Sequence, residues 1–547
     1  MKSRPQDGIF YFRYVISRTK LFLLSILSGV LFFLAWPPMG FPVILFFAFV
    51  PLLKMEHAFS TGQTTARRTL LFGLSYLTFF IWNVSTTWWV YNASLGGAAM
   101  AILANSLLMA MVFWIFHVVK RRLLSLGWRL QTANWLFPIF WIGFEFFHHR
   151  WDLTWPWLTL GNAFAANHTW IQWYEYTGVP GGSLWALTLN LFFFEWLNGK
   201  PKKVFVIIPI IILPIAISLL RYTAYGYQYT LPGPKVNVVV VQPNIDPYSE
   251  KFSGMNFEEQ LNKMLELAKQ KIDATTDYLV FPETALTEEI WENDLDQTAS
   301  IHILKEFLKK YPKLRIITGA STWHLYEEGE KISVTARKFK QQEGYYDAFN
   351  TALQIDTSAK IQIYHKSKLV PGVERMPYPA VFGFLGKLAI DLGGMSGSLG
   401  TQDERTVFKG KERIAPVVCY ESIYGEYVGE YINNGANLIF IITNDGWWRD
   451  TPGYKQHLLY GRLRAIETRR CIARSANTGI SCFIDERGDF SQETEWWKPA
   501  VIQASINHNS EKTFYTKHGD IIGRVCFYVS GIVLLFAVVM RFVRRKS

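Results

Sequence analysis

Long apolar stretches fill the first 220 residues of the chain, and one more lies near its C-terminus. A helix needs about 20 mainly apolar residues to cross the hydrocarbon core of a membrane. The first two stretches are separated by Trp36, Pro37 and Pro38, where an alternative is a hairpin that does not cross completely. The pattern predicts eight membrane-spanning helices, at residues 21–36, 41–55, 69–91, 98–119, 134–147, 178–197, 204–220 and 521–540.

Residues 235–515 follow a different pattern, in which short β-rich runs alternate with polar helical stretches. This alternation predicts an α/β or α+β domain of layered sheets. The chain thus divides into a seven-helix membrane region at 1–221, an inserted α/β domain at 222–518, and a last membrane helix with a basic tail at 519–547. We expect strands at 236–242, 277–281, 315–320, 348–356, 360–364, 414–419, 438–443 and 479–485, and helices at 256–271 and 456–474.

The excess positive charge lies in the apolar parts of the chain. The net charge is +12, and only 18% of the residues are charged. Residues 1–220 carry 16 Lys and Arg against 6 Asp and Glu, and residues 521–547 carry 5 against none. A nucleic-acid-binding protein would place its basic patch on the polar folded block. The charge distribution therefore argues against nucleic-acid binding and for a membrane protein.

The basic clusters also predict how the chain is oriented in the membrane. With eight spans, the clusters before the first span, in alternate loops and after the last span all lie on one side. Because basic loops stay in the cytoplasm, we expect both termini there and the α/β domain on the outer side of the inner membrane. A cleaved signal peptide is the alternative at the N-terminus, but seven more spans follow and no small-residue cleavage site is evident.

Three reactive residues each lie at, or just beyond, the end of an apolar strand: Glu283, Lys366 and Cys419. Strand ends, where loops meet, are common places for a site on a rigid sheet. An acid, a base and a thiol there suggest nucleophilic catalysis, in which Cys419 attacks a carbonyl carbon. Glu283 would take the thiol proton, and Lys366 would stabilise the oxyanion. Each residue alone has a plainer interpretation, as a buried thiol or a solvated charge.

The sequence around each of these residues resembles a signature segment of the nitrilase superfamily. The segments read LVFPETAL at 279–286, YHKSKLVPGVE at 364–374 and VVCYES at 417–422. The resemblance implies an αββα sandwich with a Glu-Lys-Cys triad. Two further segments, TNDGWW at 443–448 and RLRAIETRR at 462–470, resemble the family's Asn-Asp-x-Trp and Arg-Ala-x-Glu patterns.

A nitrilase-like domain between membrane helices resembles the apolipoprotein N-acyltransferase family. That family transfers an acyl chain from a membrane phospholipid to the α-amine of the S-diacylglyceryl N-terminal cysteine of apolipoproteins, the last step of bacterial lipoprotein maturation. The resemblance implies a bacterial inner-membrane enzyme with a periplasmic catalytic domain, monomeric and without cofactor or metal. Because one thiol must serve two lipids, we expect a ping-pong reaction through a thioester.

Smaller matches to this family give auxiliary roles to Glu374, Asn350, Tyr420 and Glu421. Glu374 lies eight residues after Lys366 and is expected to position it or the oxyanion region. The chain departs from the family pattern at three places, which are Pro371-Gly372-Val373 for Pro-Phe-Gly, Trp448 for Phe, and Phe252 for Trp.

The cysteines permit two interpretations. Cys419, Cys471 and Cys482 lie in the α/β domain, where an oxidising compartment would favour disulfides. A Cys471–Cys482 disulfide is one possibility, but we expect two buried thiols, because the first lies in a predicted helix and the second in a strand core. Cys419 must stay unpaired, and Lys366 is expected to lower its pKa and keep a thiolate accessible. The cysteines lack the paired spacing of a zinc site.

An unusually apolar segment at 378–392 interrupts the polar block. We interpret it as a membrane-facing arm beside the lipid entrance, with a buried crossing as the alternative. Two other functions compete with acyl transfer. A membrane-tethered nitrilase-type amidase would keep the same triad. A transporter or receptor with an inactive nitrilase-like domain would show a line of intramembrane charges, whereas the predicted spans hold only Glu145 and Glu195 as acidic residues.

Overall fold

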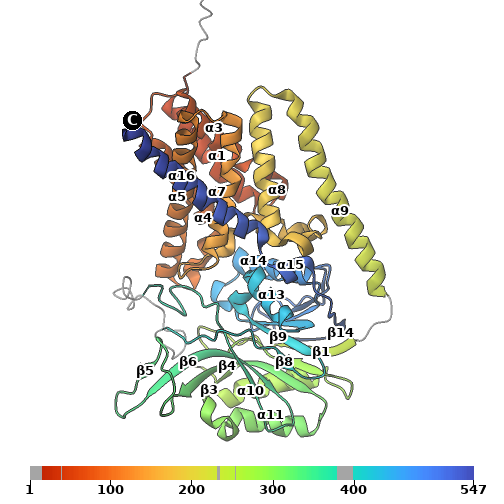
Figure 1. The fold of residues 1–547 in the computed structure, drawn as a ribbon. Coiled ribbons are helices and arrows are strands. Elements are labelled where there is room, and N and C mark those ends of the chain that lie inside the picture. The colour runs from red at the N-terminus through yellow and green to blue at the C-terminus, as the bar shows by residue number, and fades with distance from the viewer. Residues whose placement is uncertain (1–14, 39, 231–234, 253, 379–397, 547) are drawn as a thin grey trace, which may run out of the picture.

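The computed structural model describes residues 15–38, 40–230, 235–252, 254–378 and 398–546. It has two parts, a bundle of long helices and an α/β domain with two sheets, which are stacked along the long axis of the molecule (Figure 1). Apart from Tyr378, the predicted arm at 378–392 lies outside the described residues.

Each of the eight predicted spans corresponds to helix in the structure. Six regions of the described chain are long and apolar enough to cross a membrane, and α7 and α8 are not among them. Helix α7 has only 13 residues, and α8 is broken at Gly178. The protein therefore has a multi-span membrane region. The helices are α1 (Arg18–Ala35), α2 (Leu45–Ala48), α3 (Val50–Thr61), α4 (Thr69–Thr87), α5 (Leu95–Ser125), α7 (Leu136–His148), α8 (Tyr174–Leu197), α9 (Val204–Thr230) and α16 (Ile521–Lys546).

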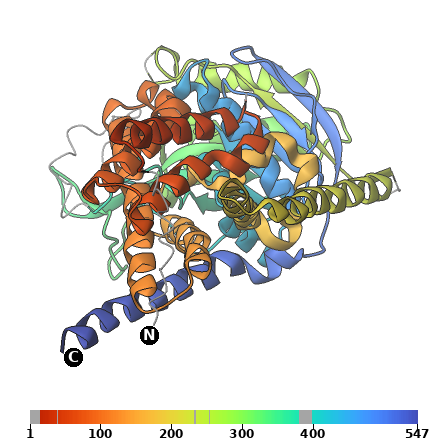
Figure 2. The same cartoon turned by 90° about the horizontal axis from the view of Figure 1, so that it is seen from above.

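Helices α9 and α16 lie at the edge of the bundle and are largely uncovered by protein. Seen from above, they run outward in different directions (Figure 2). Only 11% of the apolar stretch of α9 and 6% of that of α16 are buried in the protein. Long apolar helices with so little protein cover are suited to a lipid environment. Helix α9 also continues past residue 221, the predicted end of the first region.

The α/β domain is an αββα sandwich, as the resemblance to nitrilases implies. One sheet has the order β14-β1-β2-β4-β6-β5, with β3 beside β4 and β7 beside β6, and the other has the order β13-β12-β11-β10-β9-β8. Helices α10 (Phe257–Lys269) and α11 (Ala299–Lys309) cover the sheet that is far from the membrane helices, whereas α13 (Gly425–Asn433) and α14 (Pro452–Thr468) lie between the second sheet and the bundle (Figure 1).

The strands of the first sheet are β1 (Lys235–Gln242), β2 (Tyr278–Val280), β3 (Leu286–Trp291), β4 (Arg315–Leu325), β5 (Arg337–Lys338), β6 (Tyr345–Ile355), β7 (Gln362–His365) and β14 (Ala500–Asn507). Those of the second sheet are β8 (Phe408–Lys409), β9 (Arg413–Val418), β10 (Leu438–Thr443), β11 (Ile472–Ala476), β12 (Cys482–Ile484) and β13 (Phe490–Ser491). Strands β9, β10 and β11 are parallel and completely buried beyond Arg413, because helices cover one face and the other sheet covers the opposite face.

The helix predicted at 456–474 is shorter than expected. Helix α14 begins at Pro452 and ends at Thr468, where Arg469 adopts a left-handed conformation with φ of 51°. The chain then enters β11 at Ile472. Residues 472–476 pair with β10 as strand β11, and this pairing overrides the helical propensity of the arginine-rich segment.

A polar cluster joins the two parts of the molecule. The side-chain oxygen of Gln456, on α14, accepts hydrogen bonds from the indole nitrogens of Trp157 at 2.7 Å and Trp89 at 3.2 Å. Its amide nitrogen donates to the carbonyl of Pro37 at 2.9 Å. All three side chains are nearly inaccessible to solvent. These hydrogen bonds fix the position of the α/β domain on the membrane part, because a shift of the domain would leave buried polar groups without partners.

Gly178 allows a sharp change of direction in α8. Its φ is 62° and its ψ is −171°, a conformation that L-residues avoid, and an added Cβ would lie 2.3 Å from the ring of Tyr515. We expect Gly178→Ala to lower the free energy of unfolding by at least about 2 kcal/mol. Thermal unfolding in detergent measures the effect. Gly429→Ala is the control, since an added Cβ on this α13 glycine would meet nothing within 4 Å; equal unfolding temperatures for both variants would contradict the argument.

Candidate active site

Glu283, Lys366 and Cys419 line one cavity of about 890 Å³. Glu283 follows β2 of the first sheet, Lys366 follows β7 of the same sheet, and Cys419 follows β9 of the second sheet. The cavity thus lies where strand ends from both sheets converge. All three side chains are buried, with exposed fractions of 6%, 1% and 9%, so their charges act on one another with little screening by water.

The ammonium group of Lys366 lies between two carboxylates. Its Nζ donates to Glu283 Oε1 at 2.9 Å and to Glu374 Oε1 at 2.7 Å. Burial alone would lower the pKa of Lys366, but the two carboxylates, with Cys419, raise it well above its ordinary value. Burial alone would raise the pKa of Glu283, yet Lys366 and the hydrogen bond from Asn350 hold it below its ordinary value. The resting site therefore contains a carboxylate and an ammonium group.

Asn350 fixes the relative positions of the two glutamates. Its side-chain nitrogen donates to Glu283 Oε1 at 2.8 Å and to Glu374 Oε1 at 3.0 Å. Its backbone carbonyl accepts from the backbone N–H of Lys366 at 2.8 Å. The second oxygen of each carboxylate is also held, by the N–H of Asn444 at 3.1 Å for Glu283 and by the N–H of Val370 at 2.9 Å for Glu374. The predicted auxiliary residues Asn350 and Glu374 thus lie in the cavity.

Cys419 is held in an unusual backbone conformation at the turn after β9. Its φ is 49°, which is rare for a residue with a side chain. Burial and the negative charge of Glu283 raise the pKa of the thiol well above its ordinary value, and Lys366 only partly opposes them. The expectation that Lys366 keeps a thiolate is therefore wrong, because burial penalises the charged form and Lys366 is already neutralised by two glutamates. The side chain of Cys419 is therefore a thiol in the resting protein, and a reaction at its Sγ would need a base.

The predicted residues Tyr420 and Glu421 point away from the cavity. The hydroxyl of Tyr420 donates to the carbonyl of Thr154 at 3.3 Å, toward the membrane helices. The carboxylate of Glu421 accepts from the hydroxyls of Tyr364 at 2.6 Å and Tyr427 at 2.7 Å and from the N–H of Ser367 at 2.8 Å. It therefore braces the nucleophile turn against the strand that leads to Lys366. Glu421 has a positioning role, and it does not face the cavity.

Two residues near the cavity, Lys251 and His457, were not predicted from the sequence. Lys251 donates to the carbonyl of Glu283 at 3.1 Å, and burial lowers its pKa to about 8. His457, on α14, contacts the carbonyl oxygen of Cys419 at 3.1 Å through Nε2 and Asp445 at 2.9 Å through Nδ1. Asp445 is in turn bound by Arg474 at 2.6 Å, and the guanidinium of Arg474 and the hydrogen bond with His457 hold the pKa of Asp445 well below its ordinary range despite burial. The segment TNDGWW contains Asp445, but nothing in it indicates that the carboxylate supports the nucleophile turn.

Known proteins resemble this chain along nearly its whole length. The family model for carbon-nitrogen hydrolases matches residues 237–514, and that for the apolipoprotein N-acyltransferase N-terminal domain matches 28–192. An apolipoprotein N-acyltransferase of Chlorobaculum tepidum is 31% identical, over 97% of this chain and 99% of its own. One of Geobacter metallireducens is 27% identical, over 96% of both chains.

The chain belongs to the apolipoprotein N-acyltransferase family. Among solved structures, Nit3 of Saccharomyces cerevisiae, a member of the nitrilase superfamily, matches with a TM-score of 0.36 and 14% identity, over 50% of this chain and 90% of its own. The family assignment rests on the full-length relatives and on the family models, and the sandwich architecture is visible in the sheets themselves.

The positions at which this member of the apolipoprotein N-acyltransferase family departs from the pattern surround the cavity. Phe252, Trp448 and Val373 all line it. The ring of Phe252 stacks on that of Trp447, with 6.4 Å between their centroids. The substitutions therefore change the shape of an apolar wall and leave the polar groups in place. Cys471 and Cys482 are buried and do not form a disulfide, which confirms the expectation of two buried thiols.

Replacing Lys366 by Met should reverse the pH dependence of stability. In the natural protein, the lowered pKa of Glu283 contributes stability above the pKa of the unfolded chain, which is lost as the pH falls through the folded value. Without the ammonium group, two buried carboxylates face each other, and the pKa of one of them rises. The variant should therefore lose stability as the pH rises from roughly 5 to 8, with a total cost of about 3–5 kcal/mol.

Unfolding temperatures across this pH range test the prediction. Lys411→Met is the matched control, because Lys411 pairs with Asp277 at 2.8 Å but is 45% exposed. An exposed pair contributes less than about 1 kcal/mol. A Lys366→Met protein that is as stable at the upper end of the range as at the lower end would show that the two glutamates are not coupled through Lys366.

Proposed function

We propose that the protein transfers an acyl chain from a membrane phospholipid to the α-amine of the S-diacylglyceryl N-terminal cysteine of apolipoproteins. The observation that carries the proposal is an apolar cavity next to the thiol cavity. A second, apolar cavity of about 520 Å³ adjoins it, and Val370 and Val373 line both. This second cavity extends to Met100, Ala104 and Leu108 on membrane helix α5. An acyl chain can therefore reach the thiol without leaving an apolar environment, which supports lipid substrates over small amides.

The chemistry would proceed in two half-reactions. Glu283 accepts the proton of Cys419 as Sγ attacks the ester carbonyl carbon of the phospholipid, and Lys366 stabilises the oxyanion. The tetrahedral intermediate collapses when the ester C–O bond breaks, and the leaving alkoxide takes the proton from Glu283 to give a lysophospholipid. The amine of the acceptor then attacks the thioester carbonyl and gives its proton to Glu283. Collapse of this second intermediate breaks the C–S bond, and the proton returns to the thiolate.

Glu374 acts through Lys366 in this scheme. It binds the ammonium group at 2.7 Å and shares Asn350 with Glu283. A second carboxylate keeps Lys366 charged while Glu283 is transiently protonated, so the oxyanion is stabilised when it forms. Glu374 is thus proposed as a positioning residue and Glu283 as the base.

We also propose that the α/β domain lies on the periplasmic side of a bacterial inner membrane, with both termini in the cytoplasm. The support is the distribution of basic residues among the loops that join the helices. Phospholipid headgroups and exported apolipoproteins are both present at that surface. The catalytic unit is proposed to occupy 222–518 and to act as a monomer without a cofactor.

A covalent intermediate should accumulate on Cys419. With phospholipid present and no acceptor, intact-protein mass spectrometry should show one thioester-linked acyl group, with a burst of about one lysophospholipid per enzyme. Cys419→Ala should lose both, and Cys419→Ser should keep little activity, because an alcohol needs a stronger base. Cys482→Ala is the control, since this buried thiol lies in β12, outside the cavity lining. Full activity of Cys419→Ala, or intersecting instead of parallel steady-state plots, would rule out the two-step route.

Replacing Glu283 by Gln should change two rates in opposite directions. Loss of its negative charge lowers the pKa of the Cys419 thiol, so iodoacetamide, which reacts with the thiolate, should label Cys419 faster at a given pH. Loss of the base should slow formation of the acyl-enzyme by about 10²–10⁴-fold. Glu374→Gln is the comparison, and it should leave slow acylation. A parallel decrease of both rates in Glu283→Gln would indicate a general distortion of the site.

A further inference from the structure

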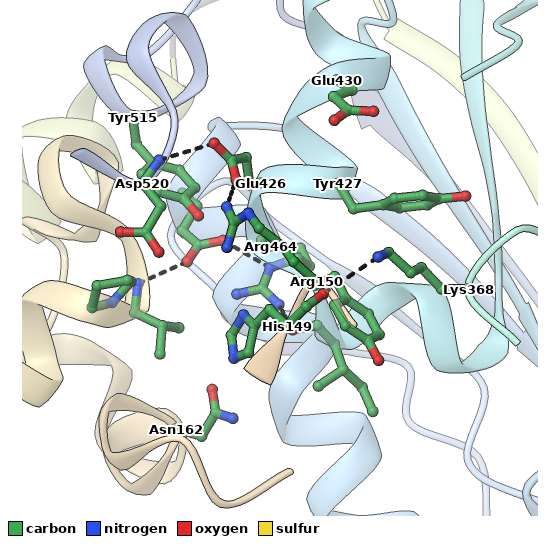
Figure 3. A pocket seen from close by; sticks show the side chains of 16 residues that line it. His149, Arg150, Asn162, Lys368, Glu426, Tyr427, Glu430, Arg464, Tyr515 and Asp520 are labelled. Carbon is green, nitrogen blue, oxygen red and sulfur yellow. Dashed lines mark hydrogen bonds and ion pairs between the residues drawn. The ribbon is translucent and has the colours of Figure 1, made fainter. Parts of the chain in front are cut away.

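A second polar cavity of about 630 Å³ lies between the membrane helices and the α/β domain (Figure 3). The nucleophile turn separates it from the thiol cavity, since Cys419 lines the thiol cavity and Ile423, four residues later, lines this one. Arg464, of the RLRAIETRR segment, points into it, as do Arg150 and Lys368. None of these three residues lines the thiol cavity, so the reaction described above does not use them.

Two of the three cations keep unused hydrogen-bonding capacity. Arg464 is 1% exposed, and its Nη2 has no hydrogen-bond partner in the part of the chain that the structure describes. Lys368 Nζ contacts only a backbone carbonyl, that of His149 at 3.4 Å, and two tyrosine rings, and no carboxylate among the described residues pairs with it. A buried guanidinium nitrogen without an acceptor is costly, so an acceptor is expected there.

The amino terminus of α13 lies in the same wall. This helix begins at Gly425, and its N-cap residue, Tyr424, makes no side-chain hydrogen bond to it. Gly425 and Tyr424 both line the cavity. The free N–H groups and the positive end of the helix dipole add to the two cations, a combination that favours an anion such as a phosphate group.

The acidic residues of the cavity already have partners. Glu467 accepts from Arg464 Nε at 2.7 Å and from the N–H of Val179 at 3.0 Å. Glu426 pairs with Arg150 (Figure 3) and also with Arg524, which lies outside the cavity lining. Of the remaining carboxylates, that of Glu430 lies 3.7 Å from Arg405, and that of Asp520 accepts from the N–H of Gly523 at 2.8 Å. Among the described residues, the hydrogen-bond donors of the cavity without a carboxylate partner are therefore Nη2 of Arg464, Nζ of Lys368 and the first N–H groups of α13.

An apolar groove lies farther along α7 and α16, the helices whose ends carry Arg150 and Asp520 of the cavity. It has a volume of about 1330 Å³ and lies between α5, α7 and α16. Three side chains lie between the two spaces, and each contacts the next. The guanidinium carbon of Arg150, at the cavity, lies 3.5 Å from the ring centroid of Phe146, and Phe146 lies 5.7 Å from Phe527, which lines the groove.

We propose that the cavity and the groove together bind one membrane phospholipid, with its phosphate at Arg464 and Lys368 and an acyl chain between α5, α7 and α16. A charged cavity at the end of an apolar groove matches the two ends of such a molecule. The site is separate from the thiol cavity and does not depend on the acyl transfer proposed above. The bound lipid would fill the junction between the membrane helices and the helices that support the nucleophile turn.

Gly531 offers a way to block the groove without disturbing the fold. It lines the groove, and an added Cβ would meet no atom within 4 Å. Gly531→Phe should therefore place an aromatic ring where the acyl chain lies. Gly73→Phe is the matched control, because Gly73 is an equally open glycine of membrane helix α4 that is not part of the groove. Lys368→Met removes the cation at the other end of the site and keeps the apolar stem of the side chain.

Native mass spectrometry of full-length protein from phosphatidylethanolamine–phosphatidylglycerol nanodiscs provides the test. All variants carry Cys419→Ala, so the readout is lipid retention and not transfer. We expect retained phospholipid to fall at least about fivefold in Gly531→Phe and in Lys368→Met, and to stay unchanged in Gly73→Phe. Inorganic phosphate at millimolar concentration should not displace the lipid, because it lacks the acyl chain.

Three results would overturn the proposal. The first is unchanged retention in both Gly531→Phe and Lys368→Met. The second is an equal loss in Gly73→Phe, which would indicate a general effect of a bulky ring in a membrane helix. The third is displacement of the lipid by inorganic phosphate alone, which would assign the cavity to a free anion. Unfolding temperatures of the variants show whether each protein is folded when its lipid is counted.

Discussion

Helix α14 carries Gln456, His457 and Arg464 into the interior of the molecule, where none of these side chains reaches bulk water. A buried polar group without a partner costs about 1–3 kcal/mol. Each of these residues therefore requires specific partners, which come from the membrane helices for Gln456 and from the nucleophile turn for the other two. The same helix thereby determines where the α/β domain sits on the bundle and how the turn at Cys419 is held.

This arrangement lets two sheets and a membrane bundle contribute to one reaction. Glu283 and Cys419 follow parallel strands, one in each sheet, and Lys366 follows β7, which pairs antiparallel with β6. Each of these side chains thus begins from the end of a paired strand. Asn350 and Lys366 then link two carboxylates that would otherwise repel each other. The bundle adds an apolar cavity that shares Val370 and Val373 with the thiol cavity. Lipid substrates need all three contributions, since neither a soluble sandwich nor a helix bundle alone provides both a preorganised charge and an apolar route.

The sequence predicts the helices and strands of this structure better than it predicts which side chains contact one another. The apolar runs are sufficient to locate the long helices of the bundle, and three short segments are sufficient to predict that Glu283, Lys366 and Cys419 share the cavity. Their spacing does not reveal that Tyr420 and Glu421 point away from it, because side-chain direction depends on the turn at Cys419, whose positive φ has no signature in VVCYES. Lys251 and His457 were missed for a related reason. Their roles come from packing between segments that lie far apart in the chain.

The protonated state of Cys419 has a consequence for the lifetime of the protein. Oxidation of cysteine by peroxides proceeds through the thiolate, and the susceptibility of a cysteine follows its thiolate character and its exposure. Burial and the charge of Glu283 lower the thiolate character of Cys419, and only 9% of the residue is exposed. A thiol with both properties reacts slowly with peroxides. Such a thiol therefore depends less on a reducing system to stay unmodified.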